Sequence, residues 1–155
     1  MRITIGFLII SILLVYCVAK NQTEDTTQTA LPLVGTWQLI SGTTIEKGDT
    51  VITYYTTNLS FIKIINATHF AFLKHDLTKG KDSLAAFGSG GGRYSLKDSI
   101  YTEHLEYCSD REWEGNDFTF TVTIKNDTLI QTGIEKVDNA GVNRINTEIY
   151  SRVKK

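Results

Sequence analysis

Between Asp117 and Lys125 the chain alternates strictly between large apolar residues and threonine. Two phenylalanines, a valine and an isoleucine hold the even positions from 118 to 124, and threonines hold the odd positions between them. A period of two residues is typical of a β-strand with one buried face and one solvated face. Asn126 and Asp127 follow as a turn signal. The stretch therefore predicts a strand that leads into a hairpin.

Similar short runs, separated by turn residues, continue along most of the chain. They predict about nine strands at the spacing of a sandwich or barrel. Helical periodicity is weak, with a trace only around 76–86. Short connections favour pairing between consecutive strands. We therefore expect an all-β fold, an antiparallel up-and-down β-barrel of about eight to nine strands. The predicted strands cover residues 34–41, 50–56, 59–65, 68–75, 93–97, 99–108, 117–125, 128–134 and 144–153.

The first residues have a different pattern. Arg2 precedes an almost unbroken apolar run over residues 3–16. A short apolar segment behind a positive charge is typical of an export signal, which we place at residues 1–19. Two cleavage sites are compatible with it. One resembles a bacterial lipoprotein box in which Cys17 becomes the lipidated first residue, and the other is a small-residue site ending at Ala19.

A polar segment without aromatic residues or periodicity follows the signal. It covers residues 20–32 and predicts a flexible tether. The barrel domain is then expected over 33–155. This division predicts an exported protein of the periplasm, the outer membrane or the exterior, attached to a membrane if Cys17 carries lipid.

The net charge and the number of cysteines limit the functions that this sequence can support. The 155 residues have a formal net charge of −1 and no basic run. We therefore expect no nucleic acid partner. Cys108 is the only other cysteine, so the processed chain has no internal disulfide. We interpret Cys108 as a small apolar residue in a strand.

The glycine-rich stretch at residues 88–92 raises the question of phosphate binding. A phosphate loop of the Walker type ends in Gly-Lys-Ser/Thr and opens a helix. Here Arg93 follows and a strand is predicted next. Glycines in a barrel strand are more typical of a bend, a bulge or a close backbone approach. We expect the bend, which also leaves room inside the barrel.

Candidate catalytic and metal motifs are weak in this sequence. It contains neither Gly-x-Ser-x-Gly nor His-Glu-x-x-His. The spacing of His69, His75 and His104 does not demand a metal site. We therefore predict no metal, no cofactor and no catalytic residue. Glu103 and Glu148 are the carboxylates on which an enzyme of this fold would depend.

The first and last predicted strands carry a family resemblance. Gly35, Thr36 and Trp37 resemble the glycine-x-tryptophan motif of the first lipocalin strand, and Arg152 takes the place of the arginine that lipocalins pair with that tryptophan. The stretch 90–107 resembles small exported lipocalin-like proteins of Bacteroidetes, many of them domains of unknown function. The resemblance implies that Gly35, Trp37 and Arg152 close the barrel by cation–π stacking.

The face that contains Arg152 also contains Glu148. If Arg152 meets Trp37 inside the barrel, as the resemblance implies, this face points inward, whereas a register slip of one residue would exchange the two faces. A mixed interior of this kind suits an apolar pocket with a few polar anchors. The alternative is a structural network in which a buried Glu148–Arg152 pair is satisfied by tyrosines. The candidate ligand-binding residues are Tyr101, Glu103, Tyr107, Phe118, Phe120 and Glu148.

The sequence leads to three functional hypotheses. The first is a cell-envelope protein that binds a small apolar or amphipathic ligand in its barrel. The second is an interaction module with a filled barrel, acting through the charged loop 110–115 and Trp113. The third is a small barrel enzyme that uses cavity carboxylates, for which the motifs give no positive evidence.

Overall fold

The structure is a computed structural model that describes residues 32–81, 83 and 85–154. Within these residues the chain forms nine strands and two 3-10 helices, η1 (Arg111–Trp113) and η2 (Asp138–Ala140). The predicted signal, the lipidation candidate Cys17 and nearly all of the tether lie outside the described residues. The strands are β1 (Gly35–Glu46), β2 (Asp49–Tyr54), β3 (Leu59–Ile65), β4 (His69–Asp76), β5 (Phe87–Lys97), β6 (Ile100–Cys108), β7 (Asp117–Lys125), β8 (Thr128–Val137) and β9 (Val142–Arg152).

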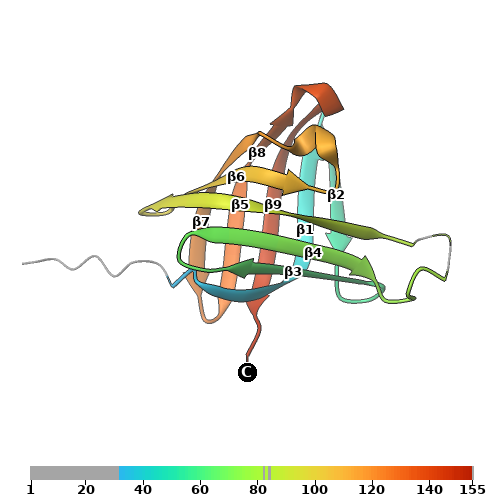
Figure 1. The fold of residues 1–155 in the computed structure, drawn as a ribbon, viewed down its shortest axis with the longest axis horizontal. Coiled ribbons are helices and arrows are strands. Elements are labelled where there is room, and N and C mark those ends of the chain that lie inside the picture. The colour runs from blue at the N-terminus through green and yellow to red at the C-terminus, as the bar shows by residue number, and fades with distance from the viewer. Residues whose placement is uncertain (1–31, 82, 84, 155) are drawn as a thin grey trace, which may run out of the picture.

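Eight of the strands close into a barrel. From β3 to β9 each strand pairs antiparallel with the next, and β1 joins β3 to β9. The predicted all-β, antiparallel up-and-down barrel is therefore confirmed. Figure 1 shows two layers: β3 to β6 run across the view, and β7, β8, β9 and β1 cross behind them at a steep angle.

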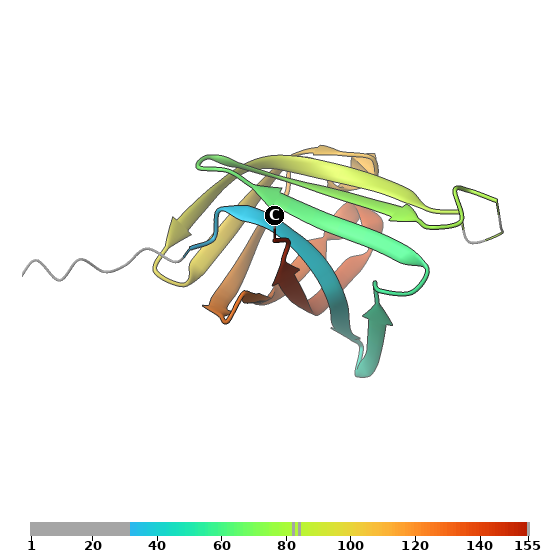
Figure 2. The same cartoon turned by 90° about the horizontal axis from the view of Figure 1, so that it is seen from below.

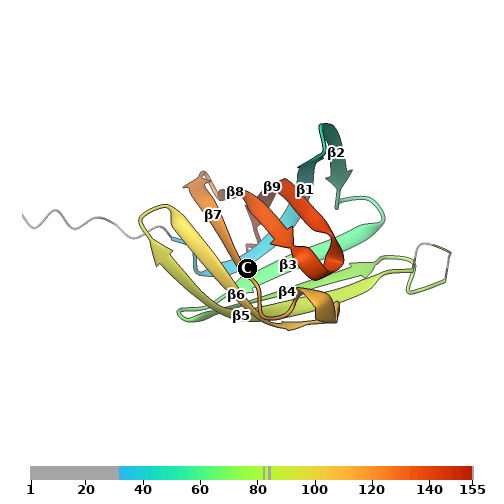
Figure 3. The same cartoon turned by 90° about the horizontal axis from the view of Figure 1, so that it is seen from above.

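The ninth strand, β2, extends the wall at one corner. Along one edge, β1 pairs with β3 over Gly35–Gln38 and with β2 over Ser41–Glu46. Its other edge pairs with β9 along most of its length. β2 thus continues the sheet where β3 turns away, and Figures 2 and 3 show it beyond the barrel wall.

Several strands are longer than predicted, and β1 and β5 differ most from the prediction. β1 continues past Gly42 to Glu46, and β5 begins at Phe87 instead of Arg93. The glycine segment of β5 pairs with the whole of β4, so backbone hydrogen bonds hold it extended despite its low strand propensity. The trace of helical period around 76–86 was misleading, because the described residues of that connection form no helix.

The glycines of β5 allow a close backbone approach. A Cβ on Gly92 would lie 1.9 Å from the backbone oxygen of His104. At this point the register with β6 shifts, since Gly91 faces Tyr107 while Gly92 faces Leu105. One extra residue on β6 is accommodated as a β-bulge. The structure therefore has a bulge and a close backbone approach where we expected a bend, and the bulge changes which β6 side chains point inward.

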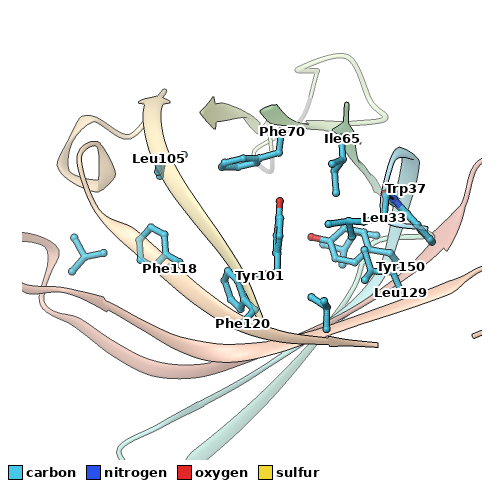
Figure 4. Packing of buried hydrophobic residues seen from close by; sticks show 13 residues of the cluster. Leu33, Trp37, Ile65, Phe70, Tyr101, Leu105, Phe118, Phe120, Leu129 and Tyr150 are labelled. Carbon is cyan, nitrogen blue, oxygen red and sulfur yellow. Dashed lines mark hydrogen bonds between the residues drawn. The ribbon is translucent and has the colours of Figure 1, made fainter. Parts of the chain in front are cut away.

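One end of the barrel is closed by packed side chains. Trp37 is fully buried, and its indole Nε1 donates to the Leu33 carbonyl at 2.8 Å. The Arg152 guanidinium lies 4.0 Å from the Trp37 ring, and its Nη1 donates to the Val34 carbonyl at 2.9 Å. Gly35 lies beneath this group, where a Cβ would meet Arg152 Nη1. Figure 4 shows the neighbouring buried side chains projecting into the interior between the two layers.

Candidate functional site

A cavity of about 530 Å³ lies inside the barrel. Its lining includes the outer half of β1, the ends of β4 and β5, and the connection between β6 and β7. None of the lining residues belongs to the Trp37–Arg152 contact, so the cavity and the closed end are separate regions of the interior. The apolar part of the wall consists of Tyr55, Phe61, Phe72, Leu105, Trp113, Phe118 and Phe120.

Aromatic contacts fix this wall on both layers. Phe61 on β3 stacks on Phe72 on β4 with ring centroids 5.6 Å apart, and Tyr55 packs edge-on against Phe61 at 5.7 Å. Across the cavity, Trp113 lies 5.7 Å from Phe118. Rings held by their neighbours keep few alternative rotamers, so the wall is largely preformed.

A cluster of polar side chains forms the floor of the cavity. Lys63 Nζ donates to Glu103 Oε1 at 2.7 Å and to Gln131 Oε1 at 3.1 Å, and it lies 3.9 Å from Glu148 Oε2. Glu148 Oε2 also accepts from Gln131 Nε2 at 2.7 Å and from the Tyr150 hydroxyl at 2.6 Å. We call these five residues the floor network. They come from β3, β6, β8 and β9, so both layers contribute to it.

Lys63 is the centre of the floor network. The residue is only 3% exposed, and a lysine buried to that degree requires compensation for its lost hydration. Glu103 supplies a charged hydrogen bond, and the rings of Phe70, Tyr101 and Tyr150 surround the ammonium at 5.9, 6.0 and 5.2 Å. The ammonium is thus held by a carboxylate on one side and by aromatic rings on the others.

The two tyrosines beside the floor differ in their hydrogen bonding. Burial, followed by the negative charge of Glu148, raises the pKa of Tyr150 well above its usual value, so its hydroxyl stays protonated and donates to that carboxylate. Burial and the charge of Glu103 likewise raise the pKa of Tyr101. The Glu103 carboxylate also interacts with the Tyr101 hydroxyl. Within the described residues, however, this hydroxyl has no partner at the distance and angle of a hydrogen bond.

A second polar cluster lies farther from the closed end of the barrel, towards the opposite end of the cavity, which we call the mouth. Arg144 Nε donates to Glu135 Oε2 at 2.7 Å, and Asn146 Nδ2 donates to Glu135 Oε1 at 2.7 Å. Burial raises the pKa of Glu135, while the adjacent Arg144 charge opposes that shift. The Arg144 guanidinium also lies 5.5 Å from the Trp113 ring, which ties η1 to β9.

Four of the six predicted ligand-binding residues line the cavity: Glu103, Phe118, Phe120 and Glu148. Tyr101 points inward but is fully buried in the core and does not line the cavity. The inward placement of Tyr107 was wrong, because its side chain is 68% exposed on the outer surface. The bulge opposite Gly92 reverses the alternation after Leu105, so Cys108 takes the inward position.

The alternative network based on a Glu148–Arg152 pair was also wrong. Arg152 lies at the closed end, where its Nε is 3.4 Å from Asp127 Oδ1. Glu148 instead belongs to the floor network, with Lys63 as its nearest cation. The two residues lie four positions apart on β9. They have different partners because the closed end and the floor lie at different depths in the barrel interior.

Sequence reasoning did not single out Lys63, Gln131 or Tyr150 as site residues. A signal for Lys63 was present, since it lies between Phe61 and Ile65 on the inward face of an apolar strand. A charged residue in that position predicts a buried partner. The identity of the partner, forty residues away on β6, had no local signal.

Residues 32–81, 83 and 85–154 contain neither a metal-binding cluster nor a membrane-crossing helix. No group of three or more His, Cys, Asp or Glu side chains there is arranged to hold a metal ion. In the same part of the chain, no helix has the length and apolar character needed to cross a membrane.

The fold and cavity define this protein as a closed antiparallel β-barrel with a hollow, polar-floored interior. The chain belongs to the family described as Domain of unknown function (DUF4488), whose model matches residues 32–155. A solved structure of an uncharacterized protein from Bacteroides eggerthii is similar, with 13% identity, a TM-score of 0.46, and coverage of 77% of this chain and 98% of the other. A comparison with curated proteins gives no match.

Proposed function

We propose that this protein binds a small amphipathic molecule inside its barrel. The observation that carries the proposal is the cavity of about 530 Å³, with aromatic walls and a polar floor. Ligand sites for small molecules typically enclose about 300–1,000 Å³ and combine an apolar lining with a few fixed polar groups. An amphipathic ligand matches this division, because its apolar part contacts the rings and its polar group reaches the floor network.

The cavity favours this proposal over an interaction module with a filled barrel. Such a module leaves no space between the layers and presents its binding residues outward. Here Trp113, the candidate contact residue of the loop 110–115, instead packs against Phe118 and Arg144 and lines the cavity. The loop thus supports the cavity wall.

The floor network also favours binding over catalysis. Both carboxylates of the floor network accept hydrogen bonds from their neighbours, Glu103 from Lys63 and Glu148 from Gln131 and Tyr150. These donors hold each carboxylate in position and leave one of its oxygens without a donor among the described residues. That arrangement suits the orientation of a bound polar group.

We also propose that the protein is lipocalin-like and that it functions outside the cytoplasm. The Arg152 stack on Trp37 at the closed end supports the lipocalin-like part. The apolar run 3–16 behind Arg2 supports export, with either lipid attachment at Cys17 or release after Ala19. An exported barrel would meet its ligand in the cell envelope or beyond it.

Two variants on β1 test the proposal. Thr44 lines the cavity, whereas Thr43, its neighbour on the same strand, does not. We expect protein from its own host to carry a small molecule in native mass spectrometry. Thr44→Trp should lose that mass because the indole occupies the cavity, and Thr43→Trp should keep it. Repeated absence of any bound mass, with no thermal shift from a panel of amphiphiles, would contradict the proposal.

A further inference from the structure

The carboxylates of the floor network have more acceptor capacity than the protein fills. Glu103 accepts from Lys63 through Oε1, and Glu148 accepts two hydrogen bonds through Oε2. No described residue donates to their other oxygens, Glu103 Oε2 and Glu148 Oε1, with the geometry of a hydrogen bond, although the Tyr101 hydroxyl interacts with the Glu103 carboxylate. A carboxylate accepts on both oxygens. Two acceptor sites at the floor are therefore open.

These two oxygens face the cavity. Both glutamates line it, and their side chains keep 9% and 16% of their exposure. Among the described residues that are not exposed, the Tyr101 hydroxyl is the only buried side-chain oxygen or nitrogen without a partner. The unpartnered oxygens of Glu103 and Glu148 therefore retain accessible surface, and a ligand seated on the floor would cover it.

The floor network carries an excess of negative charge, which likewise favours a ligand that donates hydrogen bonds. Lys63 is its one cation among the described residues, facing the carboxylates of Glu103 and Glu148. Among the other charged residues that line the cavity, Arg144 pairs with Glu135, and Lys74 and Asp110 carry opposite charges. A ligand that displaces water from the floor must therefore supply positive charge or hydrogen-bond donors, because buried carboxylate oxygens without donors are costly.

We propose that the floor binds the protonated amine of an amphipathic ligand, with its N–H groups donated to Glu103 Oε2 and Glu148 Oε1. The apolar part of the ligand extends along Phe61, Phe72 and Phe118 towards the mouth. This assignment rests on the proposed function and adds one property to it, namely the positive charge of the ligand's polar group. The same aromatic wall favours a cationic group during entry, through the negative faces of the rings.

An anionic group is the opposite possibility, and the geometry of Lys63 opposes it. The ammonium already donates to Glu103 and Gln131, and three rings surround it. A carboxylate approaching the floor would meet two like charges before reaching that lysine. The anionic alternative would use Arg144 or Lys74, which also line the cavity, so it predicts a different variant profile.

Three matched probes with one apolar tail test the inference: octylammonium, octan-1-ol and octanoate. Calorimetric titration below the aggregation concentration of each probe measures binding to the full chain. Octylammonium should bind about 10- to 100-fold more tightly than octan-1-ol, which is the range expected for added charge-assisted hydrogen bonds. Octanoate should bind more weakly than either. Nonspecific attraction is small, since the net charge of the chain is −1.

Glu148→Gln is the diagnostic variant. Its amide oxygen still accepts from Gln131 and Tyr150, but the negative charge is gone. The preference for octylammonium over octan-1-ol should fall to within about threefold, because only the cationic probe loses a charge-assisted hydrogen bond. Asp49→Asn is the matched control, because Asp49 is exposed on β2 and does not line the cavity. Glu103→Gln provides a second variant if Glu148→Gln fails to fold.

The outcomes separate the inference from the proposed function. If the three probes bind equally, or octanoate binds best, the cavity binds amphiphiles but the amine assignment is overturned. If no probe binds to the wild-type protein, both the assignment and the proposed function are contradicted. A retained preference in Glu148→Gln and Glu103→Gln would also overturn the assignment.

Discussion

Replacing Lys63 with methionine should strongly destabilise the barrel. Methionine keeps the unbranched apolar stem but removes the ammonium that lies 2.7 Å from Glu103 and 3.9 Å from Glu148. Two carboxylates then remain in the floor without a cation. Because Lys63 is 3% exposed, water does not readily replace its charge. Breaking a buried ion pair by removing one partner typically costs about 3–5 kcal/mol.

The double variant Lys63→Met with Glu103→Gln separates a lost charge pair from lost packing. Here both charges of the closest pair are gone, and the glutamine amide can still donate and accept. We expect it to recover at least about 2 kcal/mol relative to Lys63→Met, since replacing both members of a buried pair is often nearly neutral. The coupling energy follows from the cycle that includes Glu103→Gln alone.

Urea unfolding, followed by tryptophan fluorescence, measures these changes. Trp37 is fully buried and Trp113 lines the cavity, so unfolding changes the environment of both. Against a typical domain stability of about 5–15 kcal/mol, the single variant should lower the transition midpoint clearly. A loss below about 1 kcal/mol for Lys63→Met, or strictly additive effects in the cycle, would refute the buried, coupled floor network.

Two further predictions concern stability and use matched pairs, each measured by thermal and urea unfolding. Gly92→Ala should cost at least about 3 kcal/mol because its Cβ would lie 1.9 Å from a backbone oxygen, whereas Gly88→Ala, with its nearest atom at 3.8 Å, should change stability by less than about 1 kcal/mol. Equal effects would contradict the bulge. Tyr150→Phe should cost about 1.5–3 kcal/mol by losing its charged hydrogen bond, and Tyr101→Phe should be neutral or stabilising because its hydroxyl has no partner within the described residues. A larger loss for Tyr101→Phe would show that its hydroxyl is satisfied in solution.

The strand content was readable from the sequence because alternation is a local property. The runs at 59–65 and 117–125 coincide with β3 and β7 at both ends. In each, the apolar residues of one parity pack inside, as a period of two requires. The same logic placed Glu103 and Glu148 on inward faces, and both line the cavity.

The glycine segment marks where this local reasoning fails. Composition suggests a turn or bend before Arg93, but pairing with β4 and β6 holds the segment from Phe87 in a strand. Its close approach to β6 then requires the bulge that sends Tyr107 outward. The alternation rule has no information about an inserted residue, since the bulge depends on contact with another strand.

What the sequence alone determined is the number and approximate position of the strands and the alternation within each. The family resemblance added the tryptophan and arginine that meet at the closed end. What only the tertiary structure decided is which inward charges meet. Lys63 lies 40 residues from Glu103 and 68 from Gln131, and their contact depends on how two layers cross. Side-chain direction follows from backbone period along one strand, whereas partner choice follows from register and closure of the whole sheet.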